Sequence, residues 1–447
     1  MKESVTAIFD IGKTNKKLIL FGNDLGIVLE EEKKFHTVED DEGFECDDID
    51  SIERWIVDTV KQLSVSDKYD LRAVNFTTYG ATLAYLGEDG KRLTPIYNYL
   101  KPIDDRIPEN IYKRYGGRDE FCRRSASPAL GMLNSGIQVL WLKSTKPEIY
   151  SKVKHILHFP QYLSYILTGK IYSEHTSIGC HTALWDFDNM TYHPWVRDYN
   201  LNLPQPSSVS TVNEVVIEGK TINVGIGIHD SSASLAPYFE SSEKFLLLST
   251  GTWCINMNPF NTETLTSEQL DMDCLCYMSI GRKPVKSSRI FLGHMHEEAV
   301  AKIANHFMKP AAYFRTIKTD PNMIAIIQAK YDGKKIFYKS APDSMELREF
   351  IDMYEFVSYE EAYHQLMNEL CELTVESIKL ILPSGDDTSR IYITGGFSGN
   401  EVFRNYIIKA FPSKKVIVSE IVNASALGAA IVVSGLKSGN KVNLDYN

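Results

Sequence analysis

A glycine-rich segment near the middle of the chain leads into residues suited to proton transfer. It reads Val-Gly-Ile-Gly-Ile-His-Asp-Ser-Ser-Ala over residues 224–233. The two glycines would let the backbone approach a ligand, and the small residues after them suit the first turn of a helix. A carboxylate there, Asp230, can accept the proton of a substrate hydroxyl while the alcohol oxygen attacks a phosphorus atom. The same spacing also suits Asp230 as an ordinary helix N-cap beside a buried His229, so spacing alone leaves both interpretations open.

The beginning of the chain predicts a hairpin that could hold a phosphate. Apolar runs at 5–9 and 17–21 are typical of strands, and the polar residues 10–15 between them are typical of a turn. Such a loop can direct backbone N–H groups and the Thr14 hydroxyl at a phosphate, with the Asp10 carboxylate beside it for a metal ion. Ordinary hairpin turns use the same residues for conformational reasons, so this loop alone does not decide the matter.

The same pattern returns more than two hundred residues later. Residues 244–248 are expected to form a buried strand, Ser-Thr-Gly-Thr-Trp at 249–253 a tight turn, and 254–257 the returning strand. Two hairpins of a phosphate-binding type suggest two related domains. We place the boundary near residue 237, which predicts domains over residues 1–237 and 238–447.

Both predicted domains also contain segments with helical periodicity. Apolar residues recur at the spacing of one helix face over residues 358–382, and residues 52–63 show the same pattern. Strands followed by helices indicate α/β layers. In a pair of such domains, both phosphate loops can face one triphosphate across the cleft between the domains.

A third glycine loop lies near the C-terminal end of the sequence. Residues 390–394 are expected to form a strand, Gly-Gly-Phe-Ser-Gly-Asn at 395–400 a turn, and residues 401–410 a helix. Glycine backbone can lie flat against a purine and its ribose, with Asn400 supplying hydrogen bonds, although a plain strand-to-helix turn has the same composition. The glycines fit neither the dinucleotide-binding fingerprint nor a Walker A loop. A nucleotide site here must therefore be of another type.

Composition excludes several classes of protein. Of the 447 residues, 43% are hydrophobic and 24% charged, and no run reaches the roughly 18 apolar residues of a membrane helix. The net charge of −10 argues against a nucleic-acid partner. The seven cysteines are odd in number and scattered, and no signal segment is visible at the N-terminus. We therefore expect buried thiols and a cytoplasmic protein without membrane contact.

Two further polar features do not by themselves indicate a functional site. The acidic run at 39–42 is expected to be a solvated loop. His294 and His296 would share one face of a strand, but no third ligand is identifiable, so the pair by itself does not define a metal site.

Five motifs together resemble one family. They are Asp-Ile-Gly-Lys-Thr-Asn at 10–15, Gly-Ile-His-Asp at 227–230, Ser-Thr-Gly-Thr-Trp at 249–253, Gly-Gly at 395–396 and Ala-Leu-Gly-Ala-Ala at 426–430. In this order and spacing they are similar to the FGGY carbohydrate kinases, most of all to the kinases for L-rhamnulose and L-fuculose. The resemblance covers nearly the whole chain. It implies an α/β fold of two ribonuclease-H-like domains, as in actin, hexokinase and Hsp70, with a central cleft.

The resemblance also implies a role for each matching residue. Asp230 would be the general base, and Asp10 would position Mg²⁺ and its waters. The sugar would be bound by Gly80, His229, Asp230 and Ser231. ATP would be held by Gly12, Lys13, Thr14, Asn15 and Lys16 from the first loop, Gly251 and Thr252 from the second, and Gly395, Gly396 and Asn400 from the third.

The implied activity is transfer of the γ-phosphate of ATP to a hydroxyl of a ketose such as L-rhamnulose or L-fuculose. Residues 274–298 do not match the stretch in which rhamnulose kinases carry a sugar-contacting Asn and a nucleotide-contacting Gln. A pentulose or polyol kinase acting on xylulose, ribulose or glycerol therefore stays open, as does a non-catalytic ATP-binding switch or sugar sensor. Family members are commonly dimers, which implies a homodimer.

Overall fold

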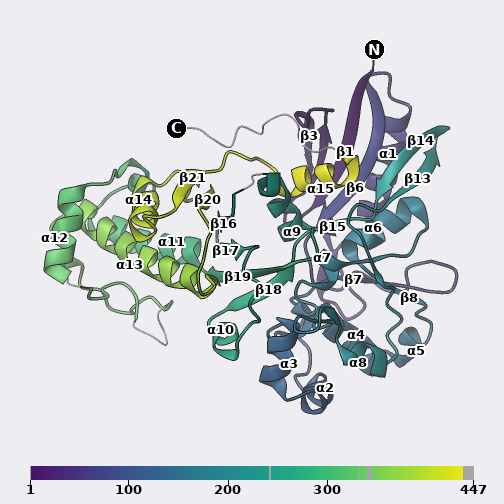
Figure 1. Ribbon diagram of the computed structural model, residues 1–447, viewed down its shortest axis with the longest axis horizontal. Coiled ribbons are helices and arrows are strands. Elements are labelled where there is room, and N and C mark those ends of the chain that lie inside the picture. Colours follow the sequence, from purple (N-terminus) through teal and green to yellow (C-terminus); the bar gives the residue numbers. More distant parts are fainter. Residues whose placement is uncertain (1, 241–242, 332, 340–344, 436–447) are drawn as a thin grey trace.

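The strands form two large sheets, one in each half of the chain (Figure 1). The computed structural model describes residues 2–240, 243–331, 333–339 and 345–435. The first sheet has the order β13-β14-β6-β1-β2-β3, with β15 paired to β6. Its strands are β1 (Glu3–Ile11), β2 (Lys16–Phe21), β3 (Ile27–Lys33), β6 (Tyr69–Thr78), β13 (Val212–Ile217), β14 (Lys220–Gly225) and β15 (Ile228–His229).

The second sheet repeats the central connectivity of the first. Its order is β18-β19-β17-β16-β20-β21, formed by β16 (Phe245–Thr250), β17 (Cys254–Asn258), β18 (Cys274–Met278), β19 (Pro284–Ile290), β20 (Arg390–Gly395) and β21 (Lys415–Val418). In the first sheet β1 pairs antiparallel with β2 and parallel with β6. In the second, β16 pairs antiparallel with β17 and parallel with β20. Both predicted hairpins and the α/β class are confirmed.

Helices pack on the first sheet. One of them lies where the apolar periodicity over residues 52–63 predicts a helix. The Asp48 side chain caps α1 (Ile49–Ser64) by accepting a hydrogen bond from the Ser51 amide. The apolar face of α1, including Ile52 and Ile56, is fully buried in a cluster with β1 and β6. A second helix, α6 (Phe159–Thr168), packs against β6 and α1.

The core of the second half lies between its sheet and a layer of longer helices. The principal one is α13 (Tyr359–Leu380), capped by the Ser358 side chain, where the 358–382 periodicity predicts a helix. It packs with α11 (Leu292–His306), α12 (Pro321–Tyr331) and α14 (Glu401–Ala410). Figure 1 shows these helices gathered on the side of the second sheet that is turned away from the first half.

Short elements fill the long connection between β6 and β13 and form a third hydrophobic cluster. The helices are α2 (Glu109–Arg114), α3 (Arg118–Ser125), α4 (Ser135–Thr145), α5 (Pro147–Tyr150), α7 (His175–Ile178) and α8 (Pro194–Asp198). The strands are β7 (Leu83–Leu86), β8 (His155–His158), β9 (Ser173–Glu174), β10 (Trp185–Asp186), β11 (Thr191–Tyr192) and β12 (Pro206–Ser207). Elsewhere β4 (Thr37–Glu39) pairs with β5 (Glu45–Asp47), and α10 (Ser267–Asp271) precedes β18.

The last helix in the described part of the chain, α15 (Ala424–Ser434), returns to the first half. It packs against β1, β6 and α9 (Asp230–Leu235). The side-chain Nδ2 of Asn75 on β6 donates to the Ala429 carbonyl at 3.0 Å. Gly428 permits the contact with α9, because a Cβ there would lie 1.9 Å from the Ala233 carbonyl oxygen. The division near residue 237 stays a prediction. Helix α15 lies after that boundary in sequence but packs on the first sheet.

Two local expectations are wrong. The acidic run at 39–42 is not simply a solvated loop, because Asp40 is buried and ion-paired with Lys101 at 2.5 Å. His294 and His296 lie on helix α11 rather than a strand, so residues two apart point to different faces. His296 is buried, whereas His294 stacks on Phe291.

One expectation from composition is confirmed. All seven cysteines are free and buried. Within the described ranges, no helix combines the length and the apolar character needed to cross a bilayer.

Candidate active site

Asp230 is the first residue of α9, and its carboxylate is partly exposed. One oxygen, Oδ1, accepts the Ser231 amide at 2.5 Å and the Ser231 hydroxyl at 3.2 Å. About a third of the side chain, 34%, remains accessible. Burial raises the pKa of Asp230 to about 6, although the hydrogen bonds from Ser231 act in the opposite direction. The carboxylate is therefore poised to exchange a proton near neutral pH.

His229 is the N-cap of α9, so the alternative that Asp230 is the cap is wrong. The ring nitrogen Nδ1 accepts the Ser231 amide at 3.2 Å. Burial lowers the pKa of His229 to about 4, so the imidazole is neutral at physiological pH. With Nδ1 accepting, the ring proton belongs on Nε2. The 3.3 Å approach of Nδ1 to the Asp230 carboxylate is accordingly no ion pair.

Gly80 lies directly beside the His229 ring. A Cβ at residue 80 would be 2.5 Å from the His229 Nε2 atom, so only glycine leaves room for the imidazole. The two segments are neighbours, because His229 on β15 pairs with Thr78, which ends β6 two residues before Gly80. Gly80, His229, Asp230 and Ser231, which the resemblance assigns to the sugar, are thus brought together.

Asp10 lies near the end of β1, which pairs with β6 as β15 does, and it is close enough to Asp230 for the two charges to interact. Its Oδ2 accepts the Ser425 hydroxyl of α15 at 2.7 Å. Burial raises the pKa of Asp10 to about 6, the Ser425 hydrogen bond lowers it, and the nearby charge of Asp230 raises it further. Two carboxylates that repel one another at the end of a sheet favour the binding of a cation between or beside them.

The loop from Gly12 to Lys16 connects β1 to β2 and is braced from within the first half. Asp47 accepts Lys16 Nζ at 2.8 Å, Lys13 Nζ at 3.1 Å and the Tyr79 hydroxyl at 2.6 Å. Lys16 is buried and also donates to the Lys13 carbonyl. It therefore stabilises the loop from below, whereas Thr14 and Asn15 are exposed at the tip.

The second loop occupies the equivalent corner of the second sheet. Gly251 and Thr252 are exposed, and the Gly251 amide donates to the Trp253 carbonyl at 2.8 Å. Helix α11 begins directly against this loop. The Gly293 amide donates to the Thr252 carbonyl at 3.0 Å, and a Cβ at Gly293 would lie 2.3 Å from the Gly251 carbonyl oxygen.

The third loop, residues 395–400, packs against the start of the second loop and lines a pocket. Gly395 has φ +85°, and a Cβ there would lie 1.8 Å from the Thr250 carbonyl oxygen, so it must be glycine. The Gly396 amide donates to the same oxygen at 2.6 Å. Asn400 caps α14 by accepting the Phe403 amide at 3.1 Å, and its amide nitrogen donates to the Tyr363 hydroxyl at 2.8 Å.

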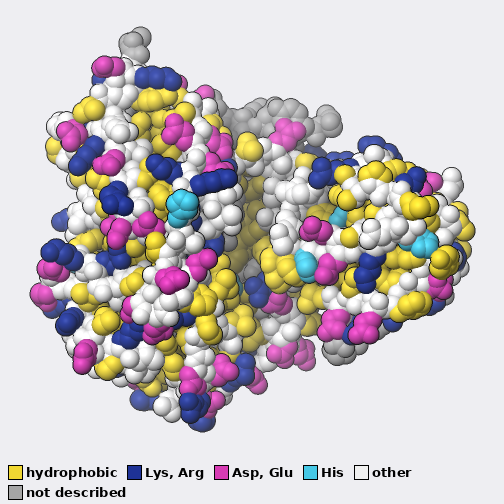
Figure 2. Space-filling model, turned by 180° about the vertical axis from the view of Figure 1, so that it is seen from behind, with side chains coloured by type: hydrophobic (Ala, Val, Ile, Leu, Met, Phe, Trp, Pro, Cys, Tyr) yellow, Lys and Arg dark blue, Asp and Glu magenta, His cyan; other side chains and the backbone are white. Residues whose placement is uncertain are grey.

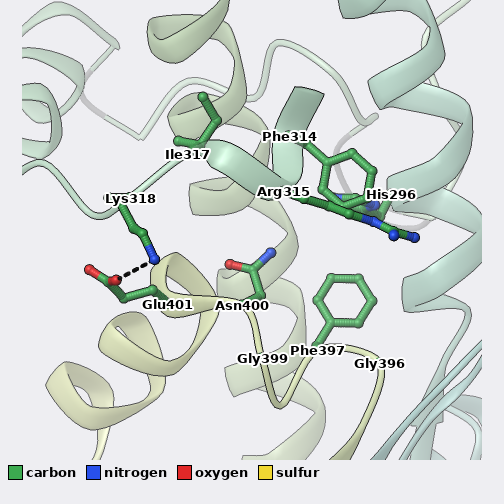
Figure 3. A pocket seen from close by; sticks show the side chains of 10 residues that line it. All are labelled: His296, Phe314, Arg315, Ile317, Lys318, Gly396, Phe397, Gly399, Asn400 and Glu401. Atoms are coloured by element: carbon green, nitrogen blue, oxygen red, sulfur yellow. Dashed lines mark ion pairs between the residues drawn. The ribbon is translucent and has the colours of Figure 1, made fainter. Parts of the chain in front are cut away.

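This pocket has a volume of about 490 Å³. Figure 3 shows Asn400 at its centre, with the aromatic rings and Arg315 on one side and the Lys318–Glu401 ion pair on the other. The lining residues are His296, Phe314, Arg315, Ile317, Lys318, Gly396, Phe397, Gly399, Asn400 and Glu401. Aromatic walls with a few polar groups suit a planar base and its ribose.

A groove separates the two halves. Figure 2 shows it between the larger lobe on the left and the smaller lobe on the right. The predicted site residues fall into two groups. The carboxylates and the first loop belong to the first sheet, and the second and third loops belong to the second sheet.

Sequence reasoning missed several residues around this site. Phe314 and Arg315 come from a short 3-10 turn without a motif, and no local signal marks them. Tyr99 is half-buried; burial raises the pKa of its hydroxyl, and the charges of Asp230 and Asp47 add to that effect. Ser425 directly precedes the motif at 426–430 but contacts Asp10 only because α15 folds back.

The carboxylates of this site suit Mg²⁺ only when waters and substrate phosphates complete its coordination. In the described part of the chain, no cluster of three or more His, Cys, Asp or Glu side chains could hold a metal ion by itself. Mg²⁺ is usually bound by one or two carboxylates together with waters and substrate phosphates. Asp10, with its cation-favouring surroundings, fits that arrangement.

Solved structures share this fold. A carbohydrate kinase from Novosphingobium aromaticivorans superimposes with a TM-score of 0.81 at 22% identity, over 97% of this chain and 91% of that one. A xylulose kinase from Rhodospirillum rubrum gives 0.78 at 14% identity, over 99% and 92%. The fold is therefore the two-domain, actin-like ATPase fold of sugar kinases.

Sequence comparison narrows the class. Residues 5–203 match the model of the N-terminal domain of the FGGY family of carbohydrate kinases. A rhamnulokinase from Oceanobacillus iheyensis is 23% identical over 95% of this chain and 91% of its own length. The N-terminal part of the chain thus matches the FGGY family of carbohydrate kinases, and these similarities indicate an ATP-dependent sugar kinase.

Proposed function

We propose that the protein transfers the γ-phosphate of ATP to a hydroxyl of a ketose, with Asp230 as the general base. The observation that carries this proposal is the Asp230 carboxylate itself. One oxygen is held by Ser231, a third of the side chain stays accessible, and its pKa lies at about 6. At pH 7 most of the carboxylate is ionised and can accept a proton.

In the proposed reaction Asp230 takes the proton of the acceptor hydroxyl as that oxygen bonds to the γ-phosphorus. The bond between that phosphorus and the β–γ bridging oxygen breaks, and ADP leaves with the bridging oxygen. The neutral His229 imidazole offers the Nε2 proton as a hydrogen-bond donor to an acceptor hydroxyl or carbonyl. Its position beside Gly80 and Asp230 supports a role in orienting the sugar.

The nucleotide is proposed to span both halves. Gly12, Lys13, Thr14 and Asn15 would contact the phosphates from one side, with Lys16 bracing that loop. Gly251 and Thr252 would contact them from the other side. Gly395, Gly396 and Asn400 would contact the adenosine in the pocket of Figure 3.

Asp10 would hold Mg²⁺ through its waters. When bound, the ion would neutralise charge on the phosphates. The Ser425 hydrogen bond would fix the Asp10 side chain for that contact.

For the acceptor we propose a deoxyketohexose such as L-rhamnulose or L-fuculose. The similarity to a rhamnulokinase over 95% of the chain supports this choice. A pentulose or polyol acceptor of the xylulose, ribulose or glycerol type is the second candidate, because a xylulose kinase shares the fold over almost the whole chain.

An assay coupled to ADP release tests the proposal. It uses ATP and Mg²⁺ with L-rhamnulose, L-fuculose, D-xylulose, L-ribulose and glycerol in turn. We expect one acceptor to stimulate ADP release, and Asp230→Asn to abolish that stimulation. ATP binding without stimulation by any acceptor would instead favour a nucleotide-binding switch or sensor.

A further inference from the structure

A third carboxyl group, that of Glu174, is linked by hydrogen bonds through Thr176 to the segment that carries the proposed base. Glu174, at the end of β9, is fully buried. It caps α7 by accepting the Thr176 amide at 2.8 Å and the Ser177 amide at 3.3 Å. Its Oε2 also accepts the hydroxyl of Thr176. Burial raises the pKa of Glu174 to about 7, whereas the three donated hydrogen bonds act in the opposite direction and favour the ionised form.

Thr176 connects this carboxylate to the segment that carries the base. The backbone N–H of His229 donates to Thr176 Oγ1 at 2.9 Å. A hydroxyl has one proton to donate, and Glu174 receives it. The lone pairs of the same oxygen are thereby directed away from Glu174 and are available to the His229 amide. The carboxylate thus sets the direction of the hydrogen bond that reaches the residue before Asp230.

The remaining contacts of this segment show why one hydrogen bond matters. Backbone and side chain of His229 are held at different points: the amide by Thr176, and the ring by the Ser231 amide and the space at Gly80. β15 is only two residues long, so few ladder hydrogen bonds secure it. The hydrogen bond that Thr176 accepts from the His229 amide is thus one of the few contacts that fix the start of α9, beside those of Gly227 with Asn75 and of Ser232 with the Met278 carbonyl.

We propose that Glu174 and Thr176 are positioning residues that hold the His229–Asp230 backbone in the geometry required for proton abstraction. Neither residue is placed in contact with the sugar or ATP. The inference rests on the proposed function, in which Asp230 is the base. It predicts that loss of the Thr176 hydroxyl impairs the chemical step while the nucleotide pocket in the other half is unaffected.

The test compares four variants of the whole chain. Thr176→Val keeps the shape of the side chain and removes the hydroxyl, and Thr176→Ser restores the hydroxyl. Thr374→Val is the matched control, because Thr374 is also buried and its hydroxyl donates to the Leu370 carbonyl within its own helix, α13. Glu174→Gln, which keeps the size of the side chain but removes its charge, is a second variant in case Thr176→Val folds poorly.

With the acceptor that the wild type uses, we expect Thr176→Val to lower kcat about tenfold, with the KM for ATP changed less than about twofold. Thr176→Ser and Thr374→Val should stay within about twofold of the wild type in both constants. Glu174→Gln should change kcat in the same direction as Thr176→Val.

Hydrogen exchange supplies a readout that needs no activity. In the protein without substrates, the His229 amide should exchange about tenfold faster in Thr176→Val than in the wild type or in Thr176→Ser. A wild type that phosphorylates no acceptor would overturn the proposed function, whereas this exchange measurement would still report on the hydrogen bond.

Three results would overturn the inference. The first is a Thr176→Val protein with wild-type kcat. The second is Thr176→Ser as impaired as Thr176→Val, because that would indicate packing rather than the hydroxyl. The third is equal loss of kcat and ATP affinity, because that would indicate general damage to the fold.

Discussion

The two halves of the molecule have the same central sheet but present different chemistry at the same corner. In the first half, β1 ends in Asp10 and Ile11 before Gly12. In the second, β16 ends in Ser249 and Thr250 before Gly251. A carboxylate on one side thus corresponds in position to a hydroxyl on the other.

The neighbouring strands differ in the same way. In the first half, β6 leads to Gly80, which makes room for the His229 ring beside Asp230. In the second, β20 leads to Gly395 and Gly396, which open the pocket under Asn400. One scaffold therefore supports two tasks. Residues at the strand ends place titratable groups on one lobe and a pocket for a flat ligand on the other.

The largest effect should come from the first half. Asp230→Asn removes the proton acceptor but keeps the shape, so kcat should fall by about 10²- to 10⁴-fold. ATP affinity should change little, because the pocket lies on the second half. Steady-state kinetics and equilibrium nucleotide binding measure the two quantities separately. Wild-type turnover in this variant would remove Asp230 from the role of base.

A substitution where α15 meets α9 should affect both stability and turnover. Gly428→Ala places a Cβ against the Ala233 carbonyl, so the helices must separate, at a cost of about 1–3 kcal/mol in the free energy of unfolding. Because α9 carries Asp230, kcat should also fall. Denaturant unfolding measures the stability.

The matched control for Gly428→Ala is Gly281→Ala. Gly281 is an exposed glycine whose Cβ would meet only the Ser279 hydroxyl, at 3.7 Å. Equal stability of the two variants would argue against the tight α9–α15 contact.

A substitution in the second half should give the opposite kinetic pattern to Asp230→Asn. Gly396→Glu fills the pocket, so the KM for ATP should rise about tenfold or more, with a smaller change in kcat. Gly396→Ala is the size control, since its Cβ would lie 3.8 Å from the Thr250 carbonyl oxygen, in ordinary contact. Unchanged nucleotide affinity in Gly396→Glu would contradict the placement of the adenosine.

The smallest effect is a pH dependence that belongs to the first half. The pKa of Asp230 is raised to about 6, and the base acts only when ionised. kcat should therefore be nearly constant above pH 7 and fall about tenfold per pH unit well below pH 6. Buffers of constant ionic strength and a saturating acceptor would reveal this limb. A profile flat from pH 5 to 8 would count against Asp230 titrating in the reaction.

Local sequence predicted much of the fold. The hairpins at 10–15 and 249–253 follow from apolar runs that flank short polar turns, and these signals lie within a few residues of one another. The helix at 358–382 was predictable for the same reason, since its apolar spacing and its Ser358 cap are adjacent in sequence. The family resemblance then grouped the candidate site residues.

Other features depend on contacts between distant segments. His294 and His296 lie on a helix and not on the expected strand. The prediction failed because two histidines two residues apart do not define a periodicity. The acidic run at 39–42 is partly buried because Lys101, about sixty residues away, pairs with Asp40. No window of the sequence contains both partners.

The amino-acid sequence by itself determined the α/β class and the two hairpins, and it singled out Asp10 and Asp230 as the carboxylates of the proposed site. Only the tertiary structure decided that α15 returns to support both of them, that Thr176 holds the His229 amide, and that residues 314, 315, 317 and 318 line the pocket proposed for the nucleotide. The physical reason is the range of the interactions. Turn and helix preferences act over a few residues, whereas burial, pKa shifts and pocket walls arise from side chains that meet only after the chain has folded.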